Sequence, residues 1–400
     1  MKPGRNLLPM GRRTALRCMF VAFVVLTLVA GTSSAVTDRP LSPLAGELFI
    51  QPRSDDFTFA VFGDFRPARR DRPYPAVFRR ILREIGMIGP HFAVSTGDAV
   101  FGYGGSFQRF RNQIDQFMSV VGSLDIPVFS VVGNHDVTGH QEREHYVRDK
   151  LGGLFGSFDV GASHFIILNT EERGSEGKIA GGQLMWLEAD LDANRDAGHI
   201  FVFMHRPMYP AMDLATVNAK PRWDVENREV LQGLFVRYRV RYVFAGDEHL
   251  FSDTTRDGVR YIISGGSGAP LHQSVPRGGF FHYLIVRVSG ANVIVDVLQP
   301  YGLDVRTVAG NDGFESRSEV EVTNLTPVDL EAKRIPLTVP LSTADHYRIG
   351  AVSIPPAGPR SEQPATISRI KDNGDGTATL GVETSLPGSS VVRITAEYDD

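Results

Sequence analysis

Polar side chains that bind metals or transfer protons follow five short apolar runs along the chain. They stand in the segments "FGDFR" (Asp64, Arg66), "TGDAV" (Asp98), "GNHD" (Asn134, His135, Asp136), "FMHRP" (His205) and "GDEH" (Asp247, His249). Carboxylate, amide and imidazole groups form the donor set of a hard or borderline divalent metal such as Mn, Fe or Zn. One such ending is ordinarily a turn, whereas five in one series indicate a shared metal site.

The apolar runs before these segments have the features of buried strands. They are four to seven residues long and rich in Val, Ile and Phe, which suits strands covered on both faces. Amphipathic helical patterns lie between them at residues 75–86, 106–118 and 181–191. This alternation predicts an α/β layered sandwich. Because ligands bind at the carboxyl ends of strands in such sheets, the polar segments are expected to meet at one edge.

The chain changes character near residue 315. Beyond it, alternating strand patterns are separated by Pro, Gly and Asn, which predicts a small β-sandwich over residues 316–400. The α/β domain is placed at residues 57–310, after a polar lead-in at residues 36–56. The run "DNGDGT" is interpreted as an Asp-Gly hairpin turn, because the ligand spacing of a helix–loop–helix calcium site is absent.

Residues 1–35 have the pattern of an export signal. A basic head precedes the apolar segment "CMFVAFVVLTLVAG", and "TSSA" ends in small residues suited to cleavage after Ala35. The segment is shorter than the about 20 residues of a membrane-spanning helix, so an uncleaved anchor is the weaker alternative. Arg12 and Arg13 partly match a twin-arginine signal, and a general secretory signal is the other alternative. We expect a secreted or periplasmic protein without a stable membrane span.

Charge and cysteine content narrow the class of protein. The chain has 42 basic and 46 acidic residues, and removing the five basic residues of the signal would leave a net charge near −9. An acidic protein is not expected to bind nucleic acid. The single cysteine, Cys18, lies inside the signal, so disulfides and thiolate chemistry are not expected and any metal must be bound by oxygen and nitrogen.

The order of the polar segments resembles the calcineurin-like metallophosphoesterase superfamily over roughly residues 57–300. The stretches "GGQLMWLEADL", "HRPMY" and "GGSGAP" look like the branch that contains purple acid phosphatases and cyclic-nucleotide phosphodiesterases. The resemblance implies a two-sheet αββα sandwich that holds two metals bridged by one Asp. It also implies hydrolysis of phosphate esters by a metal-bound hydroxide.

The resemblance assigns a role to each motif residue. Asp64 and His249 would bind the first metal, Asp98 would bridge, Asn134 and His205 would bind the second metal, and His135 would protonate the leaving group. An imidazole suits that role because its unperturbed pKa, about 6.5, is near neutral. Asp136 would orient that imidazole or its loop, with a structural turn acid as the alternative.

Two positions depart from the family pattern. Asp247 replaces a histidine, and a carboxylate can take over as a ligand while favouring harder metals. Arg66 also replaces a histidine, and a guanidinium cannot donate a lone pair to a metal. Arg66 would therefore clamp the substrate phosphate, or occupy the place of the first metal, or mark a site that binds without catalysis. Phe101 stands where purple acid phosphatases have a tyrosine, so no tyrosinate–iron colour is expected.

The sequence thus predicts an exported phosphoric-ester hydrolase, a phosphomonoesterase or phosphodiesterase, with one or two divalent metals and a small phosphate ester as substrate. The alternative is a catalytically weak binding protein with the same fold. His140, His145 and His272 are further candidates to line the cleft, with an ordinary surface histidine as the more common alternative for each. The motifs predict neither the physiological substrate nor the oligomeric state.

Overall fold

The computed structural model describes residues 41, 43–44, 55–212, 225–308, 317–340 and 347–397. The predicted export signal and nearly all of the predicted lead-in lie outside these residues, as does the predicted boundary between 310 and 316. Among the described residues, no helix combines the length and the apolar character needed to cross a membrane.

The first sheet contains the strands that precede three of the motifs. Its order is β11-β10-β1-β2-β3. Strands β1 (Asp56–Phe62), β2 (Phe92–Ser95) and β3 (Val128–Ser130) are parallel, so their carboxyl ends lie at one edge. An antiparallel hairpin of β10 (Tyr283–Ser289) and β11 (Asn292–Leu298) completes this sheet, and β10 pairs antiparallel with β1.

The second sheet has the order β4-β5-β6-β7-β9-β8. Its strands are β4 (Gly156–Val160), β5 (Ser163–Ile167), β6 (His199–Phe203), β7 (Tyr242–Ala245), β8 (Phe251–Arg256) and β9 (Val259–Ser264). Strands β5, β6, β7 and β9 are parallel, so the His205 and Asp247 motifs follow neighbouring strands at one edge.

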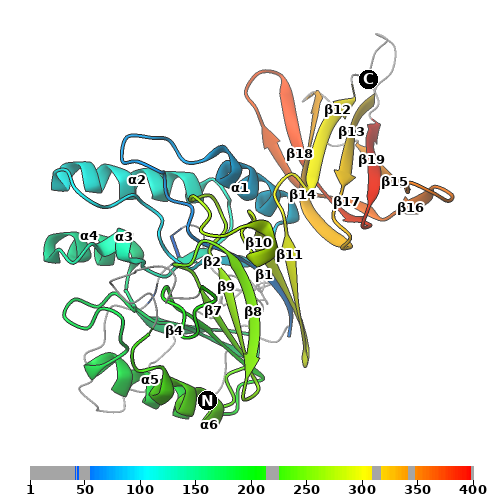
Figure 1. Cartoon of the computed structure of the whole chain (residues 1–400). Helices are drawn as coiled ribbons and strands as arrows, with labels where there is room; N and C mark the ends of the chain where they lie inside the picture. Colours follow the sequence, from blue (N-terminus) through cyan, green and yellow to red (C-terminus); the bar gives the residue numbers. More distant parts are fainter. Residues whose placement is uncertain are drawn as a thin grey trace, which may run out of the picture. The chain divides into compact units, whose positions relative to one another are not determined.

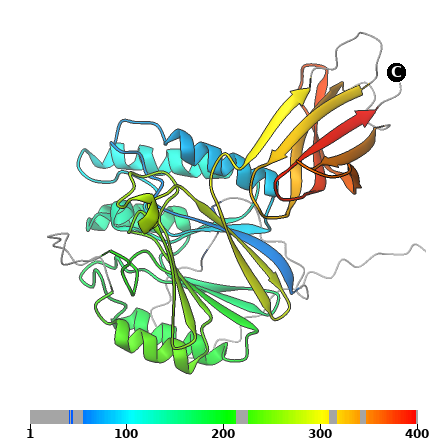
Figure 2. The same ribbon diagram turned by 45° about the vertical axis from the view of Figure 1, so that its right-hand side comes forward.

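Helices cover the outer faces of the two sheets (Figure 1). They are α1 (Ala76–Ile88), α2 (Phe107–Gly122), α3 (Asn134–Val137) and α4 (Gln141–Leu151) on the side of the first sheet, and α5 (Gly181–Ala193) and α6 (Arg228–Arg237) on the side of the second. A 3₁₀ turn, η1 (Val275–Arg277), follows β9. Figure 2 shows the same order of layers from another side, which confirms the predicted αββα sandwich.

The inner faces of the two sheets pack through aromatic side chains. Phe59 of the first sheet meets Phe165 and Phe201 of the second, and Phe92 meets Phe165, with ring centroids 5.2 to 5.4 Å apart. All four rings are fully buried. Each buried aromatic side chain contributes on the order of 2 kcal/mol of apolar burial, so this layer holds the two sheets at a fixed spacing. That spacing sets how closely the motifs of the two sheets approach each other.

In the C-terminal region, the residues that the structure describes form strands and no helix. One sheet has the order β12-β13-β19-β15-β16 and the other β14-β18-β17. The strands are β12 (Leu303–Val308), β13 (Arg317–Asn324), β14 (Leu330–Pro340), β15 (Arg348–Ile354), β16 (Ser361–Gln363), β17 (Ala365–Asp372), β18 (Thr377–Leu386) and β19 (Ser390–Glu397). The run "DNGDGT" connects β17 to β18, where Asp372 and Asp375 accept hydrogen bonds from the turn backbone, as expected for a hairpin turn.

Candidate metal centre

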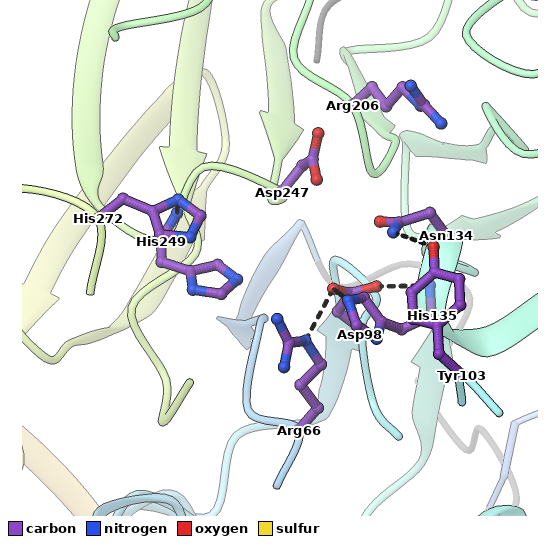
Figure 3. A pocket seen from close by; sticks show the side chains of 9 residues that line it. All are labelled: Arg66, Asp98, Tyr103, Asn134, His135, Arg206, Asp247, His249 and His272. Carbon is purple, nitrogen blue, oxygen red and sulfur yellow. Dashed lines mark hydrogen bonds and ion pairs between the residues drawn. The ribbon is translucent and has the colours of Figure 1, made fainter. Parts of the chain in front are cut away.

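The five motif segments converge on one cavity of about 250 Å³, between the carboxyl ends of the strands of both sheets (Figure 3). Its lining consists of Arg66, Asp98, Tyr103, Asn134, His135, Arg206, Asp247, His249 and His272. Asp64 and His205 lie beneath this surface and are fully buried. The predicted meeting of distant strand ends at one edge is therefore present in the structure.

The three site carboxylates share an uncommon backbone conformation. Asp64, Asp98 and Asp247 have φ angles of 55°, 56° and 66°, in the left-handed region that ordinary L-residues avoid. Aspartate tolerates this region better than most residues because its short side chain bonds to nearby backbone. Such strain at three converging carboxylates is typical of a functional site.

Glycines allow the backbone of each motif to approach its neighbours. A Cβ atom at Gly133 would collide with the carboxylate and backbone nitrogen of Asp98. A Cβ atom at Gly246 would collide with the carboxylate of Asp64, which belongs to the other sheet. The glycines before Asn134 and Asp247 are thus required by close packing around the carboxylates of Asp98 and Asp64.

A first set of donors consists of Asp64, Asp98 and His249. One ligand atom from each lies within 4.8 Å of the others, and all three residues are buried. The Oδ1 atom of Asp64 has no hydrogen-bond partner among the described residues, although it is 3.5 Å from Nε2 of His249. A buried carboxylate oxygen without a donor is costly, so this atom fits a bound cation.

A second set of donors surrounds Nε2 of His205. That nitrogen is 3.1 Å from Oδ1 of Asn134, 3.4 Å from Oδ1 of Asp98 and 3.6 Å from Oδ1 of Asp247. Asp98 belongs to both sets. The two sets contain only oxygen and nitrogen donors, which fit divalent cations.

Backbone carbonyls hold the three motif imidazoles in one tautomer. Nδ1 of His205 lies 2.8 Å from the Thr96 carbonyl oxygen, and Nδ1 of His249 lies 2.5 Å from that of Pro270. Nδ1 of His135 lies 2.6 Å from the carbonyl oxygen of Phe101. Because a carbonyl can only accept, Nδ1 carries the proton, and Nε2 of the neutral ring faces the site as a lone pair.

The electrostatics of the site show an excess of negative charge. Burial raises the pKa of Asp247 to about 7 and that of Asp64 well above its usual value. Burial opposes a charged imidazole at His205, yet the neighbouring carboxylates, Asp98 first, raise its pKa to about 10. These groups all favour added positive charge at the position between them, which a divalent metal would supply.

Arg66 contacts the Asp98 carboxylate from the cavity side. Its Nε atom donates to Oδ2 of Asp98 at 3.4 Å, and its side chain is 16% exposed, toward the cavity (Figure 3). The donor set of Asp64, Asp98 and His249 remains complete beside it. Arg66 therefore lies at the cavity wall, where its guanidinium can contact a bound anion.

The structure separates the roles of the two residues next to Asn134. The Asp136 carboxylate is buried and accepts four backbone N–H bonds, from Asp98, Ala99, Val100 and Gly133, at 2.8 to 3.2 Å. It thus fastens the loop, and none of these four bonds involves the imidazole of His135. His135 faces the cavity, with Nε2 3.8 Å from Oδ2 of Asp98. Burial lowers the pKa of His135.

Sequence reasoning missed several groups at the cavity. Arg206 donates to both oxygens of the buried Glu171, at 2.6 Å each, and Tyr103 accepts a bond from Asn134. The segment "FGYGG" around Tyr103 and the "HR" pair at Arg206 were the available signals. Of the extra histidines, His272 lines the cavity, stacked 3.8 Å from the ring of His249. His140 and His145 are exposed and do not line it.

Comparison with known families agrees with this geometry. The model of the family described as calcineurin-like phosphoesterase matches residues 57–251, which contain both donor sets. Residues 57–251 of the chain form a calcineurin-like phosphoesterase domain. It is a metal-dependent phosphoester hydrolase by family, and the donor sets around Asp98 provide the place for the metal.

Curated relatives and solved structures extend the comparison. The serine/threonine-protein phosphatase CPPED1 of Rattus norvegicus is 28% identical over 235 residues, covering 56% of this chain and 71% of that protein. The CPPED1 of Danio rerio is 27% identical over 195 residues, covering 46% of this chain and 61% of that protein. A dimetal phosphatase from Danio rerio superposes with a TM-score of 0.46 at 15% identity, covering 60% of this chain and 95% of the other. A purple acid phosphatase from yellow lupin (Lupinus luteus) superposes with a TM-score of 0.48 at 16% identity, covering 68% of this chain and 52% of the other.

Proposed function

We propose that this metallophosphoesterase hydrolyses phosphate monoesters with two divalent ions bridged by Asp98. The observation that carries the proposal is the shared carboxylate: one oxygen of Asp98 faces His205, and the Asp98 carboxylate also belongs to the triad with Asp64 and His249. Divalent ions held there would polarise a phosphoryl oxygen and lower the pKa of a bound water toward neutral. Mn, Fe and Zn fit the oxygen and nitrogen donors.

His135 is proposed as the proton donor to the leaving group. Its Nε2 faces the cavity, because Nδ1 is bonded to the carbonyl of Phe101. A protonated Nε2 can transfer its proton to a departing alkoxide within hydrogen-bond reach. The lowered pKa of His135 makes this proton easier to transfer, while a smaller fraction of the ring is protonated at neutral pH.

Arg66 is proposed to bind the non-bridging oxygens of the phosphoryl group. It enters the cavity from the loop after β1, beside the shared carboxylate. A guanidinium binds two oxygens of one phosphate in parallel, and a monoester dianion offers more charge to it than a diester does. The small polar cavity also suits a monoester, since a diester must place a second ester group in the same space.

The test uses the full chain, stripped of metal and reloaded with Mn²⁺. We expect p-nitrophenyl phosphate to be hydrolysed at least tenfold faster than its bis ester, and two equivalents of metal to remain bound. Arg66→Gln should raise KM for the monoester about tenfold and keep both equivalents. The exposed Arg306→Gln, in the C-terminal region, is the matched control.

Each other outcome selects a different function. Faster hydrolysis of the bis ester would assign a phosphodiesterase. One metal equivalent in the natural protein, rising toward two in Arg66→His, would place Arg66 at the position of the first metal. Phosphate binding without hydrolysis under any divalent metal would leave the alternative of a binding protein with this fold.

We also propose that the protein acts outside the cytoplasm, as a secreted or periplasmic enzyme on small phosphate esters. The support is the basic and apolar pattern of residues 1–35, followed by small residues before position 36. Fractionation of cells that express the full chain should place the shortened protein in the extracytoplasmic fraction. A chain of full length in the cytoplasm would refute this location.

A further inference from the structure

Tyr103 contacts both neighbouring residues of the "GNHD" motif. Its hydroxyl oxygen accepts a hydrogen bond of 2.8 Å from Nδ2 of Asn134. Its ring meets the imidazole of His135 edge to face, with centroids 4.5 Å apart and planes at 75°. Tyr103 thus lies against a ligand of the second donor set and against the proposed proton donor (Figure 3).

Two buried side chains from different helices fix the loop that holds Tyr103. Gln113 of α2 accepts a bond from the backbone N–H of Gly102, and Arg143 of α4 donates to the Gly102 carbonyl at 2.7 Å. Arg143 also donates to the carbonyl of Gly105, on the other side of Tyr103. Gly102 has φ 70°, and a Cβ atom there would collide with the carbonyl of His135. The loop is therefore built against the motif.

The contact with Asn134 bears on which end of its amide faces the metal. An amide has one oxygen that can bind a metal and one NH₂ group that cannot. In the structure Oδ1 lies 3.1 Å from Nε2 of His205, and Nδ2 is directed to the phenol of Tyr103. The phenol oxygen accepts from the NH₂ group and so stabilises this orientation of the amide. Groups that hydrogen-bond to a metal ligand ordinarily orient it and raise the affinity for the metal.

We propose that Tyr103 is a positioning residue, which holds the amide oxygen of Asn134 toward the second metal and limits rotation of the His135 ring. This inference rests on the proposed function, because it assumes that Asn134 is a ligand. Tyr103 does not touch the reacting atoms in this role. Its effect passes through the two motif residues that it contacts.

The test is a double-mutant cycle on metal affinity, which is read without turnover. The dissociation constant of Mn²⁺ is measured by competition with a chelator for the natural protein, Tyr103→Phe, Asn134→Asp and the double variant. Tyr103→Phe should weaken the second Mn²⁺ about tenfold, because the amide loses its acceptor. In the Asn134→Asp background, Tyr103→Phe should change the dissociation constant of the second Mn²⁺ less than threefold, since either carboxylate oxygen can bind the metal.

Controls separate positioning from general stability. Tyr146→Phe removes another phenol, which bonds to Asp115 on α2, and should leave Mn²⁺ affinity unchanged. An equal loss of affinity in both backgrounds, or no loss from Tyr103→Phe, would overturn the role of Tyr103. Failure of the natural protein to bind any Mn²⁺ would instead refute the proposed function. The two failures are therefore distinguishable.

Discussion

The backbone N–H of Asp247 donates to Oδ2 of Asp64 at 3.1 Å, across 183 residues of sequence. Asp64 follows β1 of the first sheet, and Asp247 follows β7 of the second. This bond joins the two sheets at the cavity floor and uses one oxygen of Asp64, while Oδ1 remains for a metal. The donor sets are thus assembled from both sheets.

Asp64→Asn should abolish binding of the first metal and lower kcat/KM about 100-fold or more, because an amide replaces a charged ligand. Metal content after gel filtration, together with phosphatase activity, measures this. The exposed Asp375→Asn is a control of the same chemistry outside the site. Retention of two metal equivalents in Asp64→Asn would contradict the assignment of Asp64.

His135→Ala should affect substrates according to their leaving groups. An alkyl phosphate needs a proton donor, so its kcat should fall about 100-fold, whereas p-nitrophenyl phosphate should lose less than tenfold. In the natural protein, kcat for the alkyl ester should fall as pH rises through the lowered pKa of His135, because the protonated ring is the active form. Equal losses for both esters would show that His135 is not the donor.

Asp136→Asn should destabilise the fold by about 2–4 kcal/mol, because an amide nitrogen would face backbone N–H groups that the carboxylate now accepts from. Urea unfolding at pH 8 measures the change. At that pH the carboxylate, whose pKa burial raises to about 7, is ionised. Unchanged unfolding in Asp136→Asn would refute the fastening role.

Glu248 is also buried, and Glu248→Gln should likewise lose acceptor strength toward the backbone of Ala211 and Met212.

His164 links β5 to α5 and should make stability depend on pH. Burial opposes its charge, but the bonds to Asp159 at 2.6 Å and Asp190 at 2.8 Å raise its pKa to about 9. A raised pKa stabilises the fold fully below the unfolded value of about 6.5, and this contribution is lost as pH rises through about 9. We expect His164 to contribute roughly 1–2 kcal/mol to the free energy of unfolding at low pH. Solvent screening reduces this contribution, because Asp159 is 66% exposed.

Urea midpoints at pH 6 and pH 10 measure that contribution. The difference between the two should shrink in His164→Gln, while the exposed His140→Gln should retain it. An equal pH dependence in His164→Gln and the natural protein would assign the effect to other groups.

The layered fold and the donor sets could be predicted from sequence because they depend on local patterns. Buried strands read as apolar runs, and their polar endings meet wherever parallel strands share an edge. Each of the six predicted ligands lies in or directly beneath the cavity. The motif pattern left three alternatives for Arg66. Its place at the cavity wall, beside the donors Asp64, Asp98 and His249, could not be predicted from the sequence.

Contacts between loops and distant helices could not be predicted in this way. Tyr103 reaches Asn134 because Gln113 and Arg143 bind the backbone of Gly102, next to Tyr103, and these polar side chains do not contribute to an apolar repeat. Glu171 and Arg206 meet across 35 positions for the same reason. Long-range side-chain pairing depends on backbone geometry, which composition and spacing do not specify.

The left-handed backbone at Asp64, Asp98 and Asp247 has a consequence for stabilising the protein by design. An aspartate in this conformation carries about 1 kcal/mol of backbone strain relative to glycine. Glycine would relieve that strain but would remove the carboxylate, which at Asp64 accepts the N–H of Asp247 from the other sheet. The usual replacement by glycine at a left-handed position would therefore trade metal ligands for relief of strain in this protein.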